Sequence, residues 1–222
     1  MDKLNNYVSE IINGSVLNIE PFPFIYVENI FPQEFYNELC LLAPQNDELT
    51  LAGANTNNKM HTAVVKSRYT YTLLFNDISL LPNGNRLNEI VNWFKYFLMP
   101  TIGKKIQINY DVEVSSLRGA FVRDEVGYRK KPHTDHPNKL FTMLLYMSDH
   151  PTSTTILKPK QQDFIDPKGN DQDYQSFKEV VSYPFKSNCA LILTRTDNSF
   201  HCVNQVTSSL PRRALHLHIW KI

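Results

Sequence analysis

The second half of the chain contains a series of short segments with β-strand composition and no helical pattern between them, and this feature restricts the fold more than any other. The segments are rich in β-branched and aromatic residues and are separated by clusters of Pro, Asn, Asp and Lys. Successive parallel strands need a long crossover, so the pattern indicates an antiparallel sandwich or jelly roll rather than a doubly wound parallel sheet. The predicted strands are 106–114, 116–122, 140–147, 153–158, 178–183, 189–194 and 213–220.

The first 105 residues have a mixed pattern, in which apolar residues recur at helical spacing in three segments. Between and after these segments lie strand-like runs and a polar, Asn-rich stretch at 45–62, which predicts a mobile loop. The predicted elements are a helix that ends at Gly14, a strand at Phe24–Val27, a helix between Pro32 and Pro44, a strand at Tyr69–Phe75 and a helix from Leu87 that Pro100 ends.

These patterns predict one domain, 1–222, with a mostly β fold and flanking helices, an α+β arrangement. Residues 1–105 form a helical and strand support region, and residues 106–222 form the β core on which the N-terminal helices pack. A chain of this length buries about 70% of the surface that its unfolded form exposes, so it needs no disulfide or metal to fold.

The composition argues against several classes of partner. Lys and Arg number 23 and Asp and Glu 22, and no basic patch is interleaved with aromatic residues, so we predict no nucleic-acid partner. The N-terminus lacks the pattern of a secretory signal and no apolar run approaches a membrane span, so we predict no membrane association. Three cysteines without a C-x-x-C pair predict a cytoplasmic protein. No feature indicates a particular oligomeric state.

The sharpest local motif is His133-Thr134-Asp135, which comes just before the apolar strand predicted at 140–147. Alternate side chains of an extended backbone share a face, so His133 and Asp135 are expected to project together. Such a motif is common, and its simpler interpretation is a hydrogen-bonded surface pair at the start of a strand. A metal ion would need a third ligand, and His201 follows the later apolar strand.

Two histidines and one carboxylate on one side of an ion form the facial triad of non-haem Fe(II) oxygenases, which leaves coordination positions open. We therefore predict a metal site at His133, Asp135 and His201. Arg212 follows on the last predicted strand. Arginine binds a carboxylate through two parallel hydrogen bonds, so a buried Arg212 implies an anionic cosubstrate.

In these motifs and their order, the chain resembles the Fe(II)- and 2-oxoglutarate-dependent oxygenases, specifically the prolyl-4-hydroxylase-like branch. The resemblance covers about residues 106–222 and, more loosely, the opening segment PFPFIYVENIFPQEFYNEL. It implies a double-stranded β-helix core of the jelly-roll, cupin-like type, and it implies that His133, Asp135 and His201 bind Fe(II). It also implies 2-oxoglutarate as cosubstrate and O2 as oxidant, with ascorbate as a further candidate.

The resemblance also indicates which residues bind 2-oxoglutarate. Arg212 matches the family arginine that pairs with the distal carboxylate, and the adjacent Arg213 is the alternative. The segment LLYMS at 144–148 resembles a recurrent family strand, LLYLN, whose tyrosine can donate to the same carboxylate; a core aromatic role for Tyr146 is equally expected. The family's usual Gly-Gly pair is replaced by PTSTTIL, in which Thr155 is expected to face the site.

Three side chains are predicted substrate contacts. The tyrosine that the family often has shortly before the first histidine is absent, and Arg123 or Asp124 takes its place, which makes Arg123 one candidate. Arg118 is another, because a charge inside a β-roll usually has a partner. His61 is the third, since it lies in the predicted loop.

Two further histidines, His216 and His218, alternate on the last strand and therefore share a face. For both, a structural role is preferred to a ligand role.

The resemblance implies hydroxylation or a related C–H oxidation of a small molecule or an amino-acid or peptidyl side chain. Halogenating relatives replace the triad carboxylate by a small residue, so Asp135 favours hydroxylation, desaturation or ring closure. Two alternatives remain open. One is a cupin-like hydrolase or isomerase whose His2Asp site holds Zn2+, for which Arg212 has no general use. The other is a non-catalytic binding module.

Overall fold

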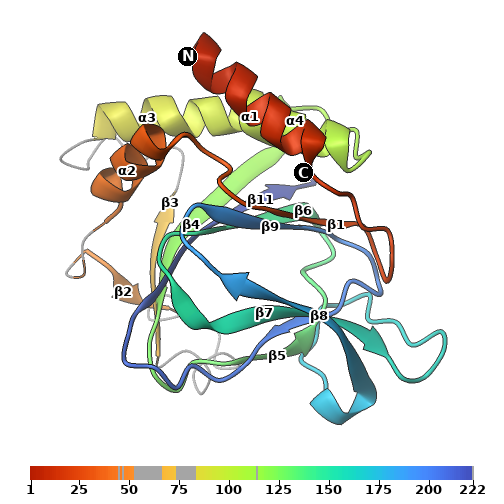
Figure 1. The fold of residues 1–222 in the computed structure, drawn as a ribbon. Coiled ribbons are helices and arrows are strands. Elements are labelled where there is room, and N and C mark those ends of the chain that lie inside the picture. Colours follow the sequence, from red (N-terminus) through yellow and green to blue (C-terminus); the bar gives the residue numbers. More distant parts are fainter. Residues whose placement is uncertain (45, 47, 53–66, 74–83, 114, 222) are drawn as a thin grey trace.

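The computed structural model describes residues 1–44, 46, 48–52, 67–73, 84–113 and 115–221. Two antiparallel sheets face each other, and helices cover the outer side of the larger sheet (Figure 1). In spatial order the larger sheet contains β1 (Phe24–Val27), β9 (Cys189–Thr194), β6 (Lys139–Tyr146), β11 (Arg212–Trp220), β4 (Ser116–Asp124), β3 (Arg68–Leu73) and β2 (Thr50–Leu51). The smaller sheet contains β5 (Lys130–His133), β10 (His201–Val203), β7 (His150–Pro159) and β8 (Phe177–Phe185).

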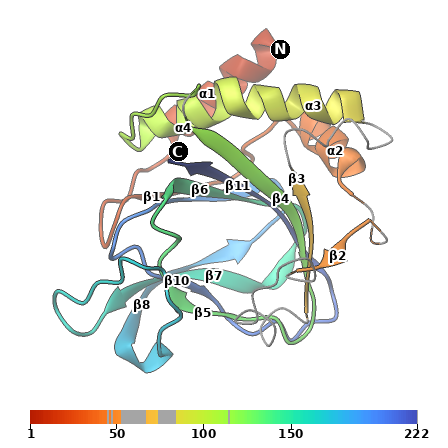
Figure 2. The same cartoon turned by 180° about the vertical axis from the view of Figure 1, so that it is seen from behind.

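The helices of the first half of the chain lie on the side away from the smaller sheet (Figure 2), whereas one short 3-10 helix leads directly into β8. No helix of the described residues is both long and apolar enough to cross a membrane. The helical elements are α1 (Asp2–Gly14), α2 (Gln33–Leu42), α3 (Gly84–Trp93), the π-helix η3 (Phe94–Leu98), α4 (Met99–Lys105) and the short 3-10 helix η4 (Tyr174–Ser176).

Alternation along the central strands divides the core into two parts. In β6, Phe141, Met143 and Leu145 pack with residues of the helices in the main hydrophobic cluster. Leu144 and Tyr146 point the other way and belong to a second cluster, which includes residues of the smaller sheet. The larger sheet is therefore buried on both faces, and its second face lines the interior of the roll.

The register of β11 determines which of its side chains enter this interior. Ala214 lies opposite Tyr146 of β6 and Val122 of β4, so Ala214 shares their face. Because side chains alternate, Arg212 and His216 lie on the same inner face. Leu215 and the other odd-numbered apolar residues of β11 belong to the helix-side cluster.

The structure confirms the predicted mostly β fold with flanking helices, but the predicted strand at 106–114 is wrong. Gln107 has a left-handed φ of 60°, and the Ile108 N–H donates to the Gly103 carbonyl over 2.8 Å, so the chain folds back on the end of α4. Ile106, Ile108 and Tyr110 pack on the helix-side cluster. Their alternation with polar residues therefore reflects an irregular segment with one buried side.

The predicted end of the long helix at Pro100 is also wrong, because helical structure continues through Lys105. A π turn precedes the proline, and in it the Met99 N–H donates to the Phe94 carbonyl five residues back. Pro100 then lies in the first turn of α4, where its missing N–H is tolerated.

Part of the loop predicted at 45–62 also differs, since Thr50–Leu51 pairs with β3. Residues 45, 47 and 53–62 of that loop, and Leu74 and Phe75 of the predicted strand at Tyr69–Phe75, lie outside the described residues.

We expect Leu145→Ala to lower the free energy of unfolding by roughly 2 to 5 kcal/mol, because Leu145 is fully buried between sheet and helices and truncation leaves a cavity. Urea denaturation measures the change. Leu41→Ala is the matched control, since Leu41 is 79% exposed and should change stability by no more than about 0.5 kcal/mol. Equal effects of the two substitutions would contradict the packing described above.

Candidate metal centre

Strand pairing brings His133 and His201 together. His133 is the last residue of β5, His201 is the first of β10, and the two lie directly opposite each other in the antiparallel register. Opposite side chains share a face, and the two imidazole centroids are 4.4 Å apart. Asp135 follows just beyond β5, and the ligand atoms of the three residues all lie within 4.8 Å of one another. The structure thus brings together the predicted metal ligands.

Hydrogen bonds leave the same nitrogen free on both imidazoles. The Nδ1 of His133 lies 2.9 Å from the Lys131 carbonyl, and the Nδ1 of His201 lies 3.0 Å from the Ser199 carbonyl. A carbonyl oxygen only accepts, so each Nδ1 carries the proton and each Nε2 keeps its lone pair. Both rings are therefore in the tautomer that binds a metal through Nε2.

The charge states also suit a metal ion. Burial lowers the pKa of His133 well below its usual value and lowers that of His201. Burial alone raises the pKa of Asp135, but the Lys139 ammonium and the nearby histidines outweigh it and bring this pKa well below the usual value. Lys139 Nζ lies 3.0 Å from Asp135 Oδ1, and Thr142 Oγ1 donates to Oδ2 over 2.5 Å. Neutral imidazoles and an ionised carboxylate are the forms that metals bind.

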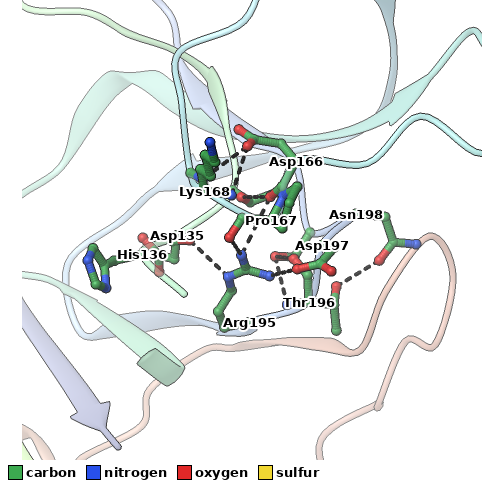
Figure 3. A network of polar contacts seen from close by, with 12 residues as sticks. Asp135, His136, Asp166, Pro167, Lys168, Arg195, Thr196, Asp197 and Asn198 are labelled. Carbon is green, nitrogen blue, oxygen red and sulfur yellow. Dashed lines mark hydrogen bonds and ion pairs between the residues drawn. The ribbon is translucent and has the colours of Figure 1, made fainter. Parts of the chain in front are cut away.

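The main chain at Asp135 is held by a buried arginine from the segment after β9 (Figure 3). Arg195 Nε donates to the Asp135 carbonyl over 2.9 Å, Nη2 donates to the Pro167 carbonyl over 2.7 Å, and Nη1 binds Asp197 Oδ1 at 2.5 Å. The arginine therefore joins three separate segments of chain behind Asp135.

A compact turn at 166–170 completes this support (Figure 3). The Asp166 carboxylate accepts hydrogen bonds from the main-chain N–H groups of Lys168, Gly169 and Asn170, at 3.0, 3.1 and 2.6 Å. The Thr134 hydroxyl donates to the Asp166 carbonyl over 2.8 Å. Gly169 has a φ of 75°, and a Cβ built on it would lie only 2.9 Å from the Asp135 carbonyl oxygen. The turn thus packs against the backbone of the H-x-D motif at a distance that only glycine permits.

A second buried polar group lies at the start of β11. Arg212, which is 2% exposed, donates to Asp124 Oδ2 over 2.8 Å and to Thr154 Oγ1 over 3.0 Å. Arg68 donates to both oxygens of the same Asp124 carboxylate, over 2.6 and 2.9 Å. Two guanidinium groups therefore share one carboxylate, which leaves a net positive charge inside the roll.

Two donors beside this group have no partner among the described residues. They are Arg212 Nε and the Tyr146 hydroxyl, and both atoms are buried. Each residue contacts the Phe185 ring, with the Arg212 guanidinium carbon 4.1 Å and the Tyr146 ring 4.0 Å from its centroid. Burial raises the pKa of Tyr146 to about 12, so the hydroxyl keeps its proton. Unpaired buried donors are costly, and a bound anion would satisfy both.

Other predicted residues lie away from this interior. Arg213 points to the opposite face from Arg212 and donates to Asn46 Oδ1 over 2.6 Å. Arg123 lies directly opposite Arg213 and pairs with Glu125 at 3.0 Å, so the structure does not bring it to the metal ligands. Thr155 shares a 2.7 Å hydrogen bond with Ser182, and its neighbour Thr154 makes the contact to Arg212 instead.

Two predicted substrate contacts remain, Arg118 and His61. Arg118 lies opposite His218, on the inner face, and His218 Nδ1 lies 2.9 Å from Thr142 Oγ1. His61 lies outside the described residues. Sequence reasoning missed Arg68 and Thr154 in the buried polar group around Arg212, and Arg195 and the 166–170 turn behind Asp135. None of these residues belongs to a recognisable motif, and only the fold shows their positions.

No protein-family model and no curated protein sequence matches this chain. Solved structures do match it. The carbocyclase SnoK from nogalamycin biosynthesis, a non-haem alpha ketoglutarate-dependent enzyme, has a TM-score of 0.58 at 9% identity over 100% of this chain and 84% of its own. A Pseudomonas putida prolyl-4-hydroxylase has a TM-score of 0.58 at 10% identity, over 97% and 99%. The epimerase SnoN, in complex with Fe3+, alpha ketoglutarate and nogalamycin RO, has a TM-score of 0.56 at 11% identity, over 99% and 83%.

The chain has the fold of the Fe(II)- and 2-oxoglutarate-dependent oxygenases. The predicted double-stranded β-helix is therefore confirmed, and one neighbour is a prolyl-4-hydroxylase, the branch that the sequence motifs resemble. The three neighbours are named for three different reactions, so the shared fold does not specify a reaction for this chain.

We expect Gly169→Ala to weaken metal binding at least tenfold, because the added methyl would displace the Asp135 main chain. Anaerobic titration with Co(II), followed by its visible absorption, measures the affinity. Gly127→Ala is the matched control, since Gly127 also has a positive φ, of 91°, but its Cβ would have no neighbour closer than 4.0 Å. Similar losses in both variants would show that backbone strain, rather than contact with Asp135, is responsible.

Proposed function

We propose that this protein is an Fe(II)- and 2-oxoglutarate-dependent oxygenase. It couples oxidative decarboxylation of 2-oxoglutarate to succinate and CO2 with hydroxylation, or a related C–H oxidation, of a small molecule or an amino-acid side chain. The observation that carries the proposal is the presence, in one roll interior, of a His2Asp cluster and a separate buried anion site at Arg212.

The donor set fits iron. His133 and His201 each offer a free Nε2, and Asp135 offers an ionised carboxylate. A triad of this kind leaves positions for a bidentate cosubstrate and for O2. When bound, iron would supply the oxidative chemistry, while the protein positions the reactants and shields them.

The buried anion site fits the distal carboxylate of 2-oxoglutarate. Arg212 Nε and the Tyr146 hydroxyl are unpartnered donors, and the Arg68–Asp124–Arg212 group carries a net positive charge. Asp124 holds the Arg212 guanidinium in place, and Arg68 offsets the repulsion that this carboxylate would exert on an incoming anion. A metal hydrolase on the same fold would have no general need for this second site.

We expect the anaerobic protein to develop a weak visible charge-transfer absorption when Fe(II) and 2-oxoglutarate are added together. His133→Ala and Asp135→Ala should abolish the absorption, because each removes a predicted ligand. His150→Ala is the control, since His150 is not part of the cluster. A protein that binds Zn(II) at this site but gives no absorption with Fe(II) and 2-oxoglutarate would contradict the oxygenase proposal.

We expect Arg212→Ala to weaken 2-oxoglutarate binding far more than Arg213→Ala does. Loss of one partner of a buried charge pair costs roughly 2 to 5 kcal/mol, which corresponds to about 30-fold or more in affinity. The charge-transfer absorption, titrated with 2-oxoglutarate, measures both variants. Arg213 lies on the opposite face, so its removal should change affinity by less than about threefold. Equal losses would place the cosubstrate elsewhere.

A further inference from the structure

A group of basic side chains surrounds Trp220 at the edge of the roll, and we call it the basic cluster. Arg118 lies over the Trp220 ring at 4.4 Å from its centroid, and Lys139 Nζ is 5.9 Å from the same centroid. The His136 ring stacks at an angle on the indole, with the centroids 4.9 Å apart. Two separate segments, β4 and the turn that leads into β6, therefore place three basic groups around one aromatic side chain.

This cluster adjoins the metal ligands. Lys139 lies opposite Trp220 in the register and contacts Asp135 at 3.0 Å. His136 directly follows Asp135, and its ring points away from the Arg195 side chain (Figure 3). Arg118 is on the inner face opposite His218, which contacts Thr142, the hydroxyl donor to Asp135. A group bound in the cluster would therefore lie close to the metal site.

The cluster has more donors than acceptors. Among the described residues, Arg118 forms no ion pair, and the only carboxylate paired with the cluster is Asp135, which contacts Lys139. The Nδ1 of His136 accepts the Asn138 N–H at 3.1 Å, so its proton is on Nε2, and that N–H is available. Trp220 Nε1 is buried and has no partner within the described part of the chain. Arg118 and His136 are exposed, so solutes can reach the cluster.

We infer that the substrate of this enzyme carries an oxyanion, a carboxylate or a phosphate, which binds in the basic cluster with Arg118 as its main cationic contact. The inference rests on the proposed oxygenase function, because it places the anion beside the metal that oxidises the rest of the molecule. The other basic site of the interior, at Arg212, is assigned to 2-oxoglutarate, so the basic cluster is a separate second anion site. Arginine suits this role because its planar fork binds carboxylate and phosphate alike.

The binding test uses the full chain loaded with Zn(II) and 2-oxoglutarate, so that the metal and Arg212 sites are filled. Acetate and inorganic phosphate are the probes, and tryptophan fluorescence is the readout because Arg118 lies over the ring of Trp220, one of the two tryptophans. We expect at least one probe to change the emission saturably, and Arg118→Gln to weaken its binding about tenfold or more. Arg123→Gln is the matched control: it lies on the same strand but on the other face and is paired with Glu125.

A turnover test then separates the two probe classes. Succinate formation is compared between free amino acids and their amides, and between sugar phosphates and the parent sugars. We expect the charged member of the productive pair to be about tenfold or more better in kcat/KM, and Arg118→Gln to remove that preference. Preference for carboxylates identifies an acid substrate, and preference for phosphates identifies a phosphorylated one.

Two outcomes would overturn the inference: neither acetate nor phosphate changes the tryptophan emission, or Arg118→Gln and Arg123→Gln weaken binding equally. The Fe(II)–2-oxoglutarate absorption distinguishes this failure from failure of the proposed function. An intact absorption without anion binding rejects the basic cluster alone, while loss of the absorption in the unmodified protein rejects the oxygenase.

Discussion

The register of β11 is the constraint on which both the core and the site depend. This strand pairs with β4 on one side and β6 on the other, over nearly its whole length. A shift of one residue would exchange its two faces, because side chains alternate with a period of two. Arg212 and His216 would then point at the helices, and Leu215 and Leu217 would enter the polar interior. The apolar residues that bury the sheet against the helices therefore also determine which basic residues enter the interior beside His133, Asp135 and His201.

The interior tolerates charge because its charges are paired. Burying one ion is strongly unfavourable, and a buried pair is stable only when its geometry and hydrogen bonds are good. Asp124 is fully buried and receives three hydrogen bonds from Arg68 and Arg212, which meets this condition. Two guanidinium groups share this one carboxylate, so the Arg68–Asp124–Arg212 group keeps a net charge of one positive. A dianionic ligand that reaches both this group and a metal ion would complete the balance of charge inside the roll.

The sequence predicted most strands, and it singled out the three residues that the structure brings together at His133, Asp135 and His201, because both depend on local order. Short continuous apolar runs identify β6 and β9 directly, and the H-x-D motif places two candidate ligands within three residues. The distal histidine could be chosen because it follows an apolar strand. Irregular segments were harder: the 106–114 region alternates like a strand but folds back at Gln107.

Facing directions were less predictable than strand positions. In β7, the register shifts between His150 and Thr154, and Thr154 rather than Thr155 contacts Arg212 in the interior. Between Arg123 and Asp124, the sequence offered no means of choosing which residue points inward, and the structure selects the aspartate. Contacts such as Arg195 with Asp135 join residues 60 positions apart, so no local pattern could indicate them.

Arg195 and the 166–170 turn hold the main chain of Asp135 in place. The Arg195 side chain donates to the Asp135 carbonyl, and Gly169 packs against the same oxygen. The position of residue 135 is thus specified without reference to its own side chain. The side chain at position 135 can therefore change without loss of the contacts that hold the main chain there. A different side chain at this position, in a relative or in an engineered variant, would start from the same backbone position. Substitution at this one residue would then change the donor atoms offered to a metal ion while the surrounding structure stays in place.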